Sequence, residues 1–239
     1  MRIVMWSGPR NLSTAMMRSF GARADTDVVD EPFYAAYLAE TGIQHPMRAE
    51  ILADGETDWR HVAEACAAPP PPGRVRYEKH MTHHMVPGIE LDWLEGAAIA
   101  FLIRNPREVA ASYAAKREGF TLDDLGFERQ AALFEHCTAM LGAPPPVVDA
   151  TEIRRRPRET LSALCRALGL PFDDAMLTWP PGPRESDGIW AAHWYASVNR
   201  STGFAPPAGG LATLSPEIER LIAPALHLYE RLAVNALTG

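Results

Sequence analysis

The sequence predicts an α/β fold with three layers, α/β/α, built on a central, mostly parallel five-stranded sheet. Short apolar runs alternate with helical patterns, which is typical of βαβ units and of a parallel sheet covered on both faces. A length of 239 residues and an apolar content of 47% favour a folded chain with a sizeable core. The expected strands are Ile3–Trp6, Asp27–Asp30, Arg74–Glu78, Ala98–Ile103 and Pro146–Asp149.

Three helices have clear start or end signals. Asn105-Pro106 supplies an N-cap and a proline at the first helical position, so a helix should run from Pro106 to about Arg117. A second helix should begin near Pro157 and end before Gly169, because apolar residues recur between them at helical spacing. Ser215-Pro216 opens a third, amphipathic helix near the end of the sequence.

We expect a single domain over residues 1–239. Residues 40–73 end in four consecutive prolines, which exclude a helix interior or a central strand, and we interpret the segment as a surface insertion and linker. Residues 179–210 also carry several prolines and are expected to be rich in loops. The remaining residues should supply the sheet and the helices that cover it.

The composition of the chain limits the classes of partner that it is expected to bind. A formal net charge of −7 argues against nucleic acid and against an anionic membrane surface. No apolar run approaches the roughly 20 residues that span a bilayer, and the first strand starts too early for a signal peptide. The three cysteines are widely spaced and form no Cys-x-x-Cys pair, so no disulfide framework or zinc knuckle is expected. These features predict a cytoplasmic protein.

The turn after the first strand is the main candidate binding element. A strand, a polar turn and a helix start can hold a phosphate on free backbone N–H groups at the positive end of the helix dipole. This turn, Ser7–Thr14, lacks the lysine of an NTPase P-loop, since the only lysines in the chain are Lys79 and Lys116. Arg10 supplies the cation instead, and Ser13 and Thr14 supply hydroxyls.

A second anion-binding element follows the fourth strand. Arg104 lies at the carboxyl edge of the expected sheet, where open α/β folds bind ligands. Ser112 is on the next helix, on the same face as its capped end. An arginine and a hydroxyl from one strand–helix unit can together bind a phosphate.

With both elements, the chain resembles cytosolic-type sulfotransferases, which use 3′-phosphoadenosine 5′-phosphosulfate (PAPS). In that family the first loop binds the 5′-phosphosulfate, and an Arg-x-Pro segment with a helix serine binds the 3′-phosphate. The resemblance implies a P-loop-like fold, no metal, and sulfuryl transfer from PAPS to a hydroxyl or amine of a small-molecule acceptor. The implied nucleotide-binding residues are Gly8, Arg10, Asn11, Leu12, Ser13, Thr14, Arg104, Ser112, Arg200, Ser201, Thr202 and Gly203.

The last four of these residues match a late loop that closes over the nucleotide. The strand at Val147-Val148-Asp149 and the helix ending in Leu168-Gly169-Leu170 also look like a common element of the family. Arg10 stands where many members have lysine, and Leu12 stands where glycine is common. Because the late Arg-Lys-Gly motif of animal enzymes is absent, the nearest likeness is to bacterial sulfotransferase-like proteins.

Sulfuryl transfer needs charge neutralisation on the departing phosphate and removal of the acceptor's proton. Arg10 is the candidate for the first role. Glu31 follows the second strand, where some bacterial members use a carboxylate, and His80 resembles the histidine of the Lys-x-His segment in animal enzymes. We expect Glu31 and His80 to line the site jointly, with either as the base. The structural alternative for Glu31 is to cap a helix begun by Pro32.

Other functions remain as alternatives. One is a catalytically inactive nucleotide-binding protein of the same fold, and another is a P-loop kinase variant, which the missing lysine disfavours. A pyridoxal-phosphate enzyme would have to use Lys79 or Lys116 for its Schiff base.

The acceptor pocket is expected to draw on the insertion and on residues 179–210, where Trp190, Trp194 and Tyr195 either line the pocket or pack the loops. The sequence specifies neither the acceptor nor the oligomeric state.

Overall fold

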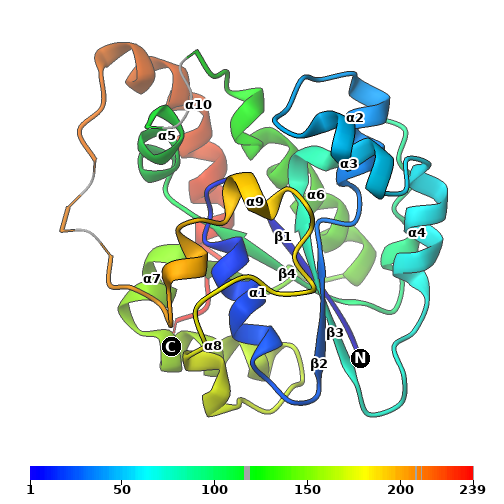
Figure 1. Ribbon diagram of the computed structural model, residues 1–239. Coiled ribbons are helices and arrows are strands. Elements are labelled where there is room, and N and C mark those ends of the chain that lie inside the picture. The colour runs from blue at the N-terminus through cyan, green and yellow to red at the C-terminus, as the bar shows by residue number, and fades with distance from the viewer. Residues whose placement is uncertain (116–118, 208, 211, 239) are drawn as a thin grey trace.

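The fold is a five-stranded, all-parallel sheet with strand order β2-β3-β1-β4-β5 (Figure 1). The structure is a computed structural model that describes residues 1–115, 119–207, 209–210 and 212–238. The strands are β1 Arg2–Ser7, β2 Thr26–Asp30, β3 Val75–Met81, β4 Ala98–Ile103 and β5 Val147–Asp149. The predicted α/β class and the number of strands are confirmed.

Helices follow and separate the strands. They are α1 Ser13–Gly21, α2 Tyr34–Thr41, α3 Arg48–Asp54, α4 Trp59–Ala67, α5 Pro106–Ala114, α6 Phe127–Leu141, α7 Ala150–Arg155, α8 Pro157–Ala167, α9 Ala191–Trp194 and α10 Pro216–Ala233. Short 3₁₀ turns lie at Thr82–His84, Asp92–Leu94, Asp123–Leu125, Asp174–Leu177 and Val198–Arg200. No helix within the described ranges is long and apolar enough to cross a membrane.

Side chains alternate across β1 and divide the core between the two faces of the sheet. Ile3 and Met5 are fully buried on one face, where α1 and α8 pack. Val4 and Trp6 are fully buried on the other face, against apolar residues of α4, α6 and α10. A strand buried on both faces has the continuous apolar sequence from which β1 was predicted.

The predicted helix signals are confirmed where the structure describes them. Asn105 caps α5 by accepting a hydrogen bond from the Arg107 N–H at 3.0 Å, and α8 begins at Pro157. Ser215 caps α10 in the same way, accepting from the Ile218 N–H. Helix α5 ends at Ala114, whereas its expected end at Arg117 lies outside the described residues.

The two irregular regions have different structures. Residues 40–73 contain α3 and α4, which bury Ile51, Val62 and Cys66 against the core before the proline run. Residues 179–210 form mostly loops around the short helix α9. We call residues 182–199 the strap, because this segment crosses the face of α1 in yellow and orange (Figure 1).

Strand β3 is longer than predicted. We expected it to end at Glu78, but it continues to Met81, so Lys79 and His80 lie inside the strand and point to opposite faces. Polar residues usually signal the end of a buried strand. Here the strand continues because Lys79 pairs with two carboxylates and His80 with a third, so neither polar group is buried without a partner.

Candidate functional site

Backbone strain marks the carboxyl edge of the sheet. Four described residues other than glycine have a positive φ, and three of them are predicted site residues: Arg10 at 59°, Leu12 at 64° and Glu31 at 45°. A side chain in this region costs about 1–2 kcal/mol, and such strain collects at functional sites. Positive φ at Arg10 and Leu12 alternates with negative φ at Asn11, which is the pattern of a backbone nest that binds anions. The conformation of Leu12 also explains why related loops favour glycine there.

The two predicted anion-binding elements meet in the structure. The Arg10 guanidinium donates from Nε to Ser112 Oγ at 3.1 Å, and Arg104 donates to the Arg10 carbonyl at 2.7 Å. Arg104 also pairs with Glu108 at 2.8 Å, whereas no described carboxylate pairs with Arg10. Burial lowers the pKa of the Arg10 guanidinium, and the neighbouring Arg104 adds to the shift. An arginine with no carboxylate partner in a partly buried site favours binding of an anion.

The rest of the first loop has unused polar groups. Asn11 donates to the Leu102 carbonyl at 2.6 Å, but its side-chain oxygen is buried without a partner. Ser13 and Thr14, at the start of α1, form no side-chain hydrogen bond to another described residue. Gly8 has a packing role, since a Cβ there would lie 3.2 Å from the Leu125 carbonyl oxygen. The loop therefore keeps polar groups available to a ligand.

The predicted late loop packs beside the strap. Ser201 accepts a hydrogen bond from the Trp179 indole at 3.1 Å, and Gly203 forms an isolated antiparallel bridge with Thr178. The Thr202 carbonyl accepts from the Trp179 N–H at 3.1 Å, and Arg200 is exposed. Among the described residues, no hydrogen bond or ion pair joins these four residues to the first loop, so their role toward a nucleotide stays a prediction.

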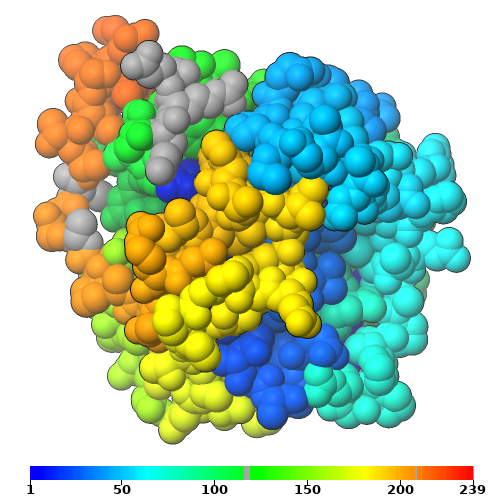
Figure 2. Space-filling model, viewed as in Figure 1, coloured from blue at the N-terminus to red at the C-terminus, as the bar shows by residue number. Residues whose placement is uncertain are grey.

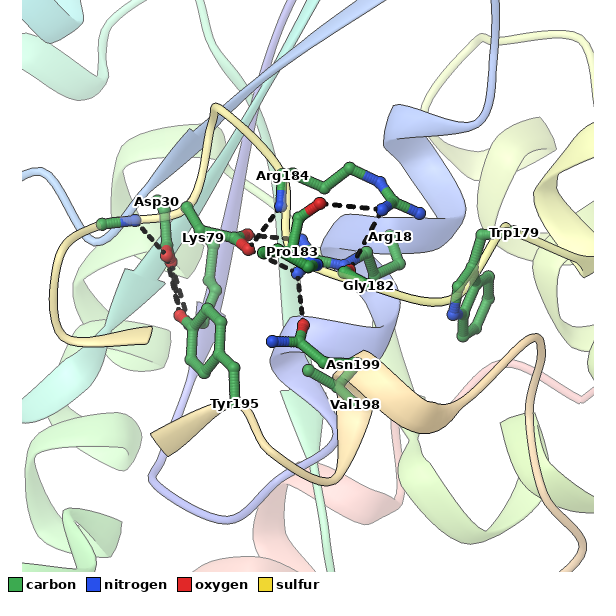
Figure 3. Close-up of polar contacts among 12 residues, drawn as sticks. Arg18, Asp30, Lys79, Trp179, Gly182, Pro183, Arg184, Tyr195, Val198 and Asn199 are labelled. Carbon is green, nitrogen blue, oxygen red and sulfur yellow. Dashed lines mark hydrogen bonds and ion pairs between the residues drawn. The ribbon is translucent and has the colours of Figure 1, made fainter. Parts of the chain in front are cut away.

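Glu31 belongs to a buried charge cluster. The Lys79 ammonium donates to Glu31 Oε1 at 2.6 Å and to Asp30 Oδ1 at 3.0 Å. The Tyr195 hydroxyl donates to both oxygens of Asp30 at 2.7 and 2.8 Å (Figure 3). Burial raises the pKa of the Glu31 carboxyl; Lys79 opposes the shift and Asp30 adds to it. Burial acts against the charge of Lys79, but the two carboxylates raise the pKa of its ammonium well above the ordinary value.

His84 faces the other oxygen of Glu31. Its Nε2 lies 3.9 Å from Glu31 Oε2, and its ring stacks between Tyr34 and Tyr37 with centroid distances of 4.7 and 4.8 Å. The Nδ1 atom of His84 is buried without a partner. Burial, with help from His83, lowers the pKa of His84 well below its ordinary value, so the ring is neutral near pH 7. A neutral imidazole with an unpaired nitrogen can bind a polar ligand group.

His80 does not join Glu31. Its ring lies among Trp6, Phe33 and Trp93 on the opposite face of the sheet, and its Nε2 lies 3.0 Å from Glu78. Cys66, Glu78 and His80 hold donor atoms within 4.8 Å of one another, an arrangement with metal-ligand types. Arg76 and Arg2 also approach Glu78, at 2.8 and 3.8 Å, and their positive charges oppose a bound cation.

A cavity of about 630 Å³ lies next to the His84 ring, on the side of the sheet that carries Glu31. Tyr37 and His83 form its inner wall, and both rings contact the His84 ring that faces Glu31. Its other walls come from the end of α2, from Tyr113 on α5 and from residues 121–132. Residues 41–45 of the predicted insertion contribute, whereas none of the described residues between 179 and 210 lines this cavity.

The strap is fixed to α1 by a buried ion pair. Arg18 binds Asp187 through two hydrogen bonds of 2.5 and 2.7 Å, with both side chains at most 4% exposed, and it also donates to Asn199 (Figure 3). In Figure 2 the yellow and orange strap covers much of the blue α1, and blue atoms reappear between the strap and the green surface of α5. The strap therefore connects the helix that starts at the first loop with the Glu31 cluster.

Removing one partner of this ion pair should strongly destabilise the protein. We expect Asp187→Asn to lower the free energy of unfolding by about 3 kcal/mol, because the Arg18 charge stays buried without compensation. Urea denaturation followed by circular dichroism measures the change. Asp174→Asn, which breaks the exposed pair with Arg158, is the matched control and should change stability by less than about 1 kcal/mol. Equal losses in the two variants would contradict the prediction.

Sequence reasoning missed the roles of Asp30, His84 and Tyr195. Tyr195 was considered only among the aromatic residues that either line a pocket or pack the loops, and His84 was given no role. One signal was available: Lys79 is one of two lysines in the chain and follows a buried strand beside Asp30-Glu31. Its three partners come from segments up to 116 residues away, a separation that no local pattern encodes.

The structure is an α/β fold with an all-parallel sheet, and the carboxyl edge of this sheet carries the two arginine-containing elements that were predicted to bind anions. A family model described as "Sulfotransferase domain" matches residues 1–236, and the chain belongs to this family. The resemblance predicted from the two loops is thereby confirmed.

Two curated relatives match most of this chain. Branched-chain-amino-acid aminotransferase-like proteins 1 and 2 of Arabidopsis thaliana are each 37% identical over 227 residues, which cover 95% of this chain. The chain spans only 40% of the length of each relative. The match therefore concerns one part of those proteins.

Two solved structures have the same fold. The sulfotransferase domain from the Synechococcus PCC 7002 olefin synthase matches with a TM-score of 0.62 and 17% identity, covering 97% of this chain and 94% of that one. The sulfotransferase domain from the curacin biosynthetic pathway matches with a TM-score of 0.54 and 17% identity, covering 97% and 95%. At this identity the likeness establishes a sulfotransferase-like architecture.

Proposed function

We propose that the protein transfers a sulfuryl group from PAPS to a hydroxyl or amine of a small-molecule acceptor. The observation that carries the proposal is the junction of the first loop with α5, where Arg10 bonds Ser112 and Arg104 bonds the Arg10 backbone. One strained turn and one strand end thus present two guanidinium groups and a hydroxyl side by side. PAPS carries two separate anionic groups, a 5′-phosphosulfate and a 3′-phosphate, which need two such elements.

Arg10 and the free N–H groups of the first loop would bind the 5′-phosphosulfate, and Arg104 with Ser112 would bind the 3′-phosphate. In the reaction, an acceptor oxygen or nitrogen forms a bond to sulfur while the bond between sulfur and the phosphate oxygen breaks. The departing 3′-phosphoadenosine 5′-phosphate (PAP) gains negative charge on its 5′-phosphate. The permanently charged guanidinium of Arg10 stabilises this charge, and stabilisation that increases in the transition state accelerates transfer.

Glu31 would take the acceptor's proton, with Lys79 fixing the orientation of its carboxylate. Its raised pKa makes it a stronger base than an exposed glutamate while it is ionised. The neutral His84 ring lies 3.9 Å from the second Glu31 oxygen and is available for a hydrogen bond with the same acceptor group. His80 is the alternative base. Its ring nitrogen already contacts Glu78, so His80 could take the acceptor's proton only if the residues around it rearranged.

The cavity of about 630 Å³ is the candidate acceptor pocket. It falls in the range of small-molecule sites, and its inner wall reaches the His84 ring beside Glu31. Its mixture of aromatic rings, hydroxyls and charged side chains suits a small polar acceptor with an apolar body.

The name of the curated relatives suggests aminotransferase chemistry as a second possibility for their longer chains. Such chemistry needs an unprotonated lysine for a Schiff base. Lys79 is buried among Asp30, Glu31 and Tyr195, and its raised pKa keeps it protonated, which disfavours this role. Lys116 lies outside the described residues.

Titration calorimetry with PAP tests donor binding, and transfer of labelled sulfate from PAPS to an acceptor panel tests the reaction. We expect a 1:1 complex with a Kd in the micromolar range, about −8 kcal/mol of binding free energy. Binding without transfer to any acceptor would favour an inactive nucleotide-binding protein. Absence of PAP binding at high micromolar concentration would overturn the proposal.

A further inference from the structure

The half-buried Arg154 side chain connects α7 with the segment that follows the late loop. Helix α7 starts where β5 ends, and β5 pairs with β4, the strand that leads to Arg104. Arg154 Nε donates to the Ala205 carbonyl and Arg154 Nη2 to the Pro206 carbonyl, both at 2.8 Å. Figure 1 shows this segment in orange as it passes α7. The two hydrogen bonds orient the guanidinium, and its Nη1 forms no hydrogen bond to another described residue.

Arg154 lies near Arg104 without a carboxylate partner of its own. Burial lowers the pKa of the Arg154 guanidinium, the charge of Arg104 adds to this shift, and Glu108 opposes it. Among the described residues no carboxylate forms an ion pair with Arg154, whereas the next residue, Arg155, pairs with Glu152 at 2.6 Å. Two guanidinium groups with one carboxylate between them leave a surplus of positive charge, which favours a bound anion.

The surplus charge belongs to Arg154 rather than to Arg104. Arg104 donates from Nε to Glu108 at 2.8 Å and from Nη1 to the Arg10 carbonyl at 2.7 Å. Glu108 therefore balances the charge of Arg104, and two of the three guanidinium nitrogens already have partners. A phosphate monoester carries about −1.5 to −2 charges at pH 7. Arg104 and Ser112 alone would leave most of this charge unbalanced.

We propose that Arg154 joins Arg104 in binding the 3′-phosphate of PAPS and links this phosphate to the segment after the late loop. The inference rests on the proposed function, because it adds one residue to the donor site. Arg154 donates to the phosphate from Nη1, while Nε and Nη2 hold the carbonyls of Ala205 and Pro206. Its charge balances the part of the phosphate charge that Arg104 cannot. The site therefore favours nucleotides that carry a 3′-phosphate.

The ratio of two dissociation constants tests this role. Adenosine 5′-phosphate (AMP) differs from PAP only by lacking the 3′-phosphate, so the Kd of AMP divided by that of PAP measures recognition of this group. Titration calorimetry on the complete chain gives the PAP value, and displacement of PAP gives the AMP value. We expect Arg154→Gln to raise the PAP Kd about 10-fold and to change the AMP Kd by less than about twofold.

Glutamine is chosen because its amide can still donate to one of the two carbonyls while it carries no charge. Arg155→Gln is the matched control, since it removes the same group from the next residue of α7 and should leave both dissociation constants unchanged. Arg154→Lys keeps the charge without the three-nitrogen geometry, and it should lower the ratio only about threefold. Circular dichroism verifies that each variant is folded. If Arg154→Gln does not fold, the ratio in Arg154→Lys decides the question.

A purely structural role for Arg154 gives a different result. The dissociation constants of PAP and AMP would then rise by the same factor, or neither would change, and either outcome overturns the inference. A wild type that binds AMP as tightly as PAP overturns it as well. If the wild type binds PAP and the Arg154 variants keep its preference over AMP, the inference fails and the proposed function stands. A wild type that binds neither nucleotide rejects the proposed function, and the inference with it.

Discussion

Replacing Arg10 with alanine should abolish most donor binding. The variant loses a guanidinium that has no described carboxylate partner, and it leaves Ser112 without its hydrogen bond. Charge-assisted hydrogen bonds to phosphate are among the stronger polar contacts, so we expect the Kd for PAP to rise about 100-fold, equivalent to about 2.7 kcal/mol. Titration calorimetry with PAP measures the loss directly, without requiring an acceptor.

Two further variants separate the role of Arg10 from a general loss of positive charge. Arg10→Lys keeps the charge but not the bidentate geometry, and it should retain part of the affinity, because many related loops carry lysine there. Arg107→Ala removes a guanidinium from α5 that pairs with Glu219 of α10, and it should bind PAP as the wild type does. If Arg10→Ala also binds PAP normally, the first loop is not the donor site.

The sheet was predictable from sequence because each strand is specified by the residues within it and directly beside it. Each strand buried on both faces gives a continuous apolar run, as in Ile3–Trp6, and Asn105-Pro106 signals a helix start through its own cap and fixed φ. Arg10 follows β1 and Arg104 follows β4. Because these strands are parallel neighbours, both arginines lie at the carboxyl edge of the sheet. The hydrogen bond between Arg10 and Ser112, which are 102 residues apart, was not predicted and comes from the structure.

The surroundings of Glu31 were less predictable, because the residues that contact Glu31 lie far from it in the sequence. Lys79 and His80 look like the polar end of a strand, but successive side chains of a strand point to opposite faces. Lys79 therefore pairs with Glu31, which follows β2, whereas His80 pairs with Glu78, two residues before it on the same strand. The left-handed conformation of Glu31 before Pro32 is also unexpected, since the residue before a proline normally takes an extended conformation. The strap that supplies Tyr195 has no periodic pattern at all, so its path over α1 depends on Arg18 and Asp187, which tertiary contacts alone bring together.

The Glu31→Gln substitution should separate chemistry from donor binding. Glutamine keeps the size of the side chain and can still accept a hydrogen bond from Lys79, but it cannot take a proton. We expect kcat to fall about 10²- to 10⁴-fold, the usual contribution of a general base, with the PAP Kd close to that of the wild type. Single-turnover transfer of labelled sulfate measures the rate, and calorimetry measures binding. Glu152→Gln, which alters a glutamate paired with Arg155 and Arg156 on the surface, should leave both quantities unchanged.

The pH profile gives the sharper form of this prediction. Glu31 accepts a proton only when ionised, and burial raises its pKa, so kcat should decrease as the pH falls through that raised value rather than near the ordinary value of about 4.3. As the pH rises through this pKa, Glu31 loses its proton and becomes able to act as a base, so kcat increases with pH along the acidic limb of the profile. In Glu31→Gln this limb should disappear, because the titrating group is gone. A limb that persists in the variant would assign the base to another group, with His84 the nearest candidate at 3.9 Å from Glu31.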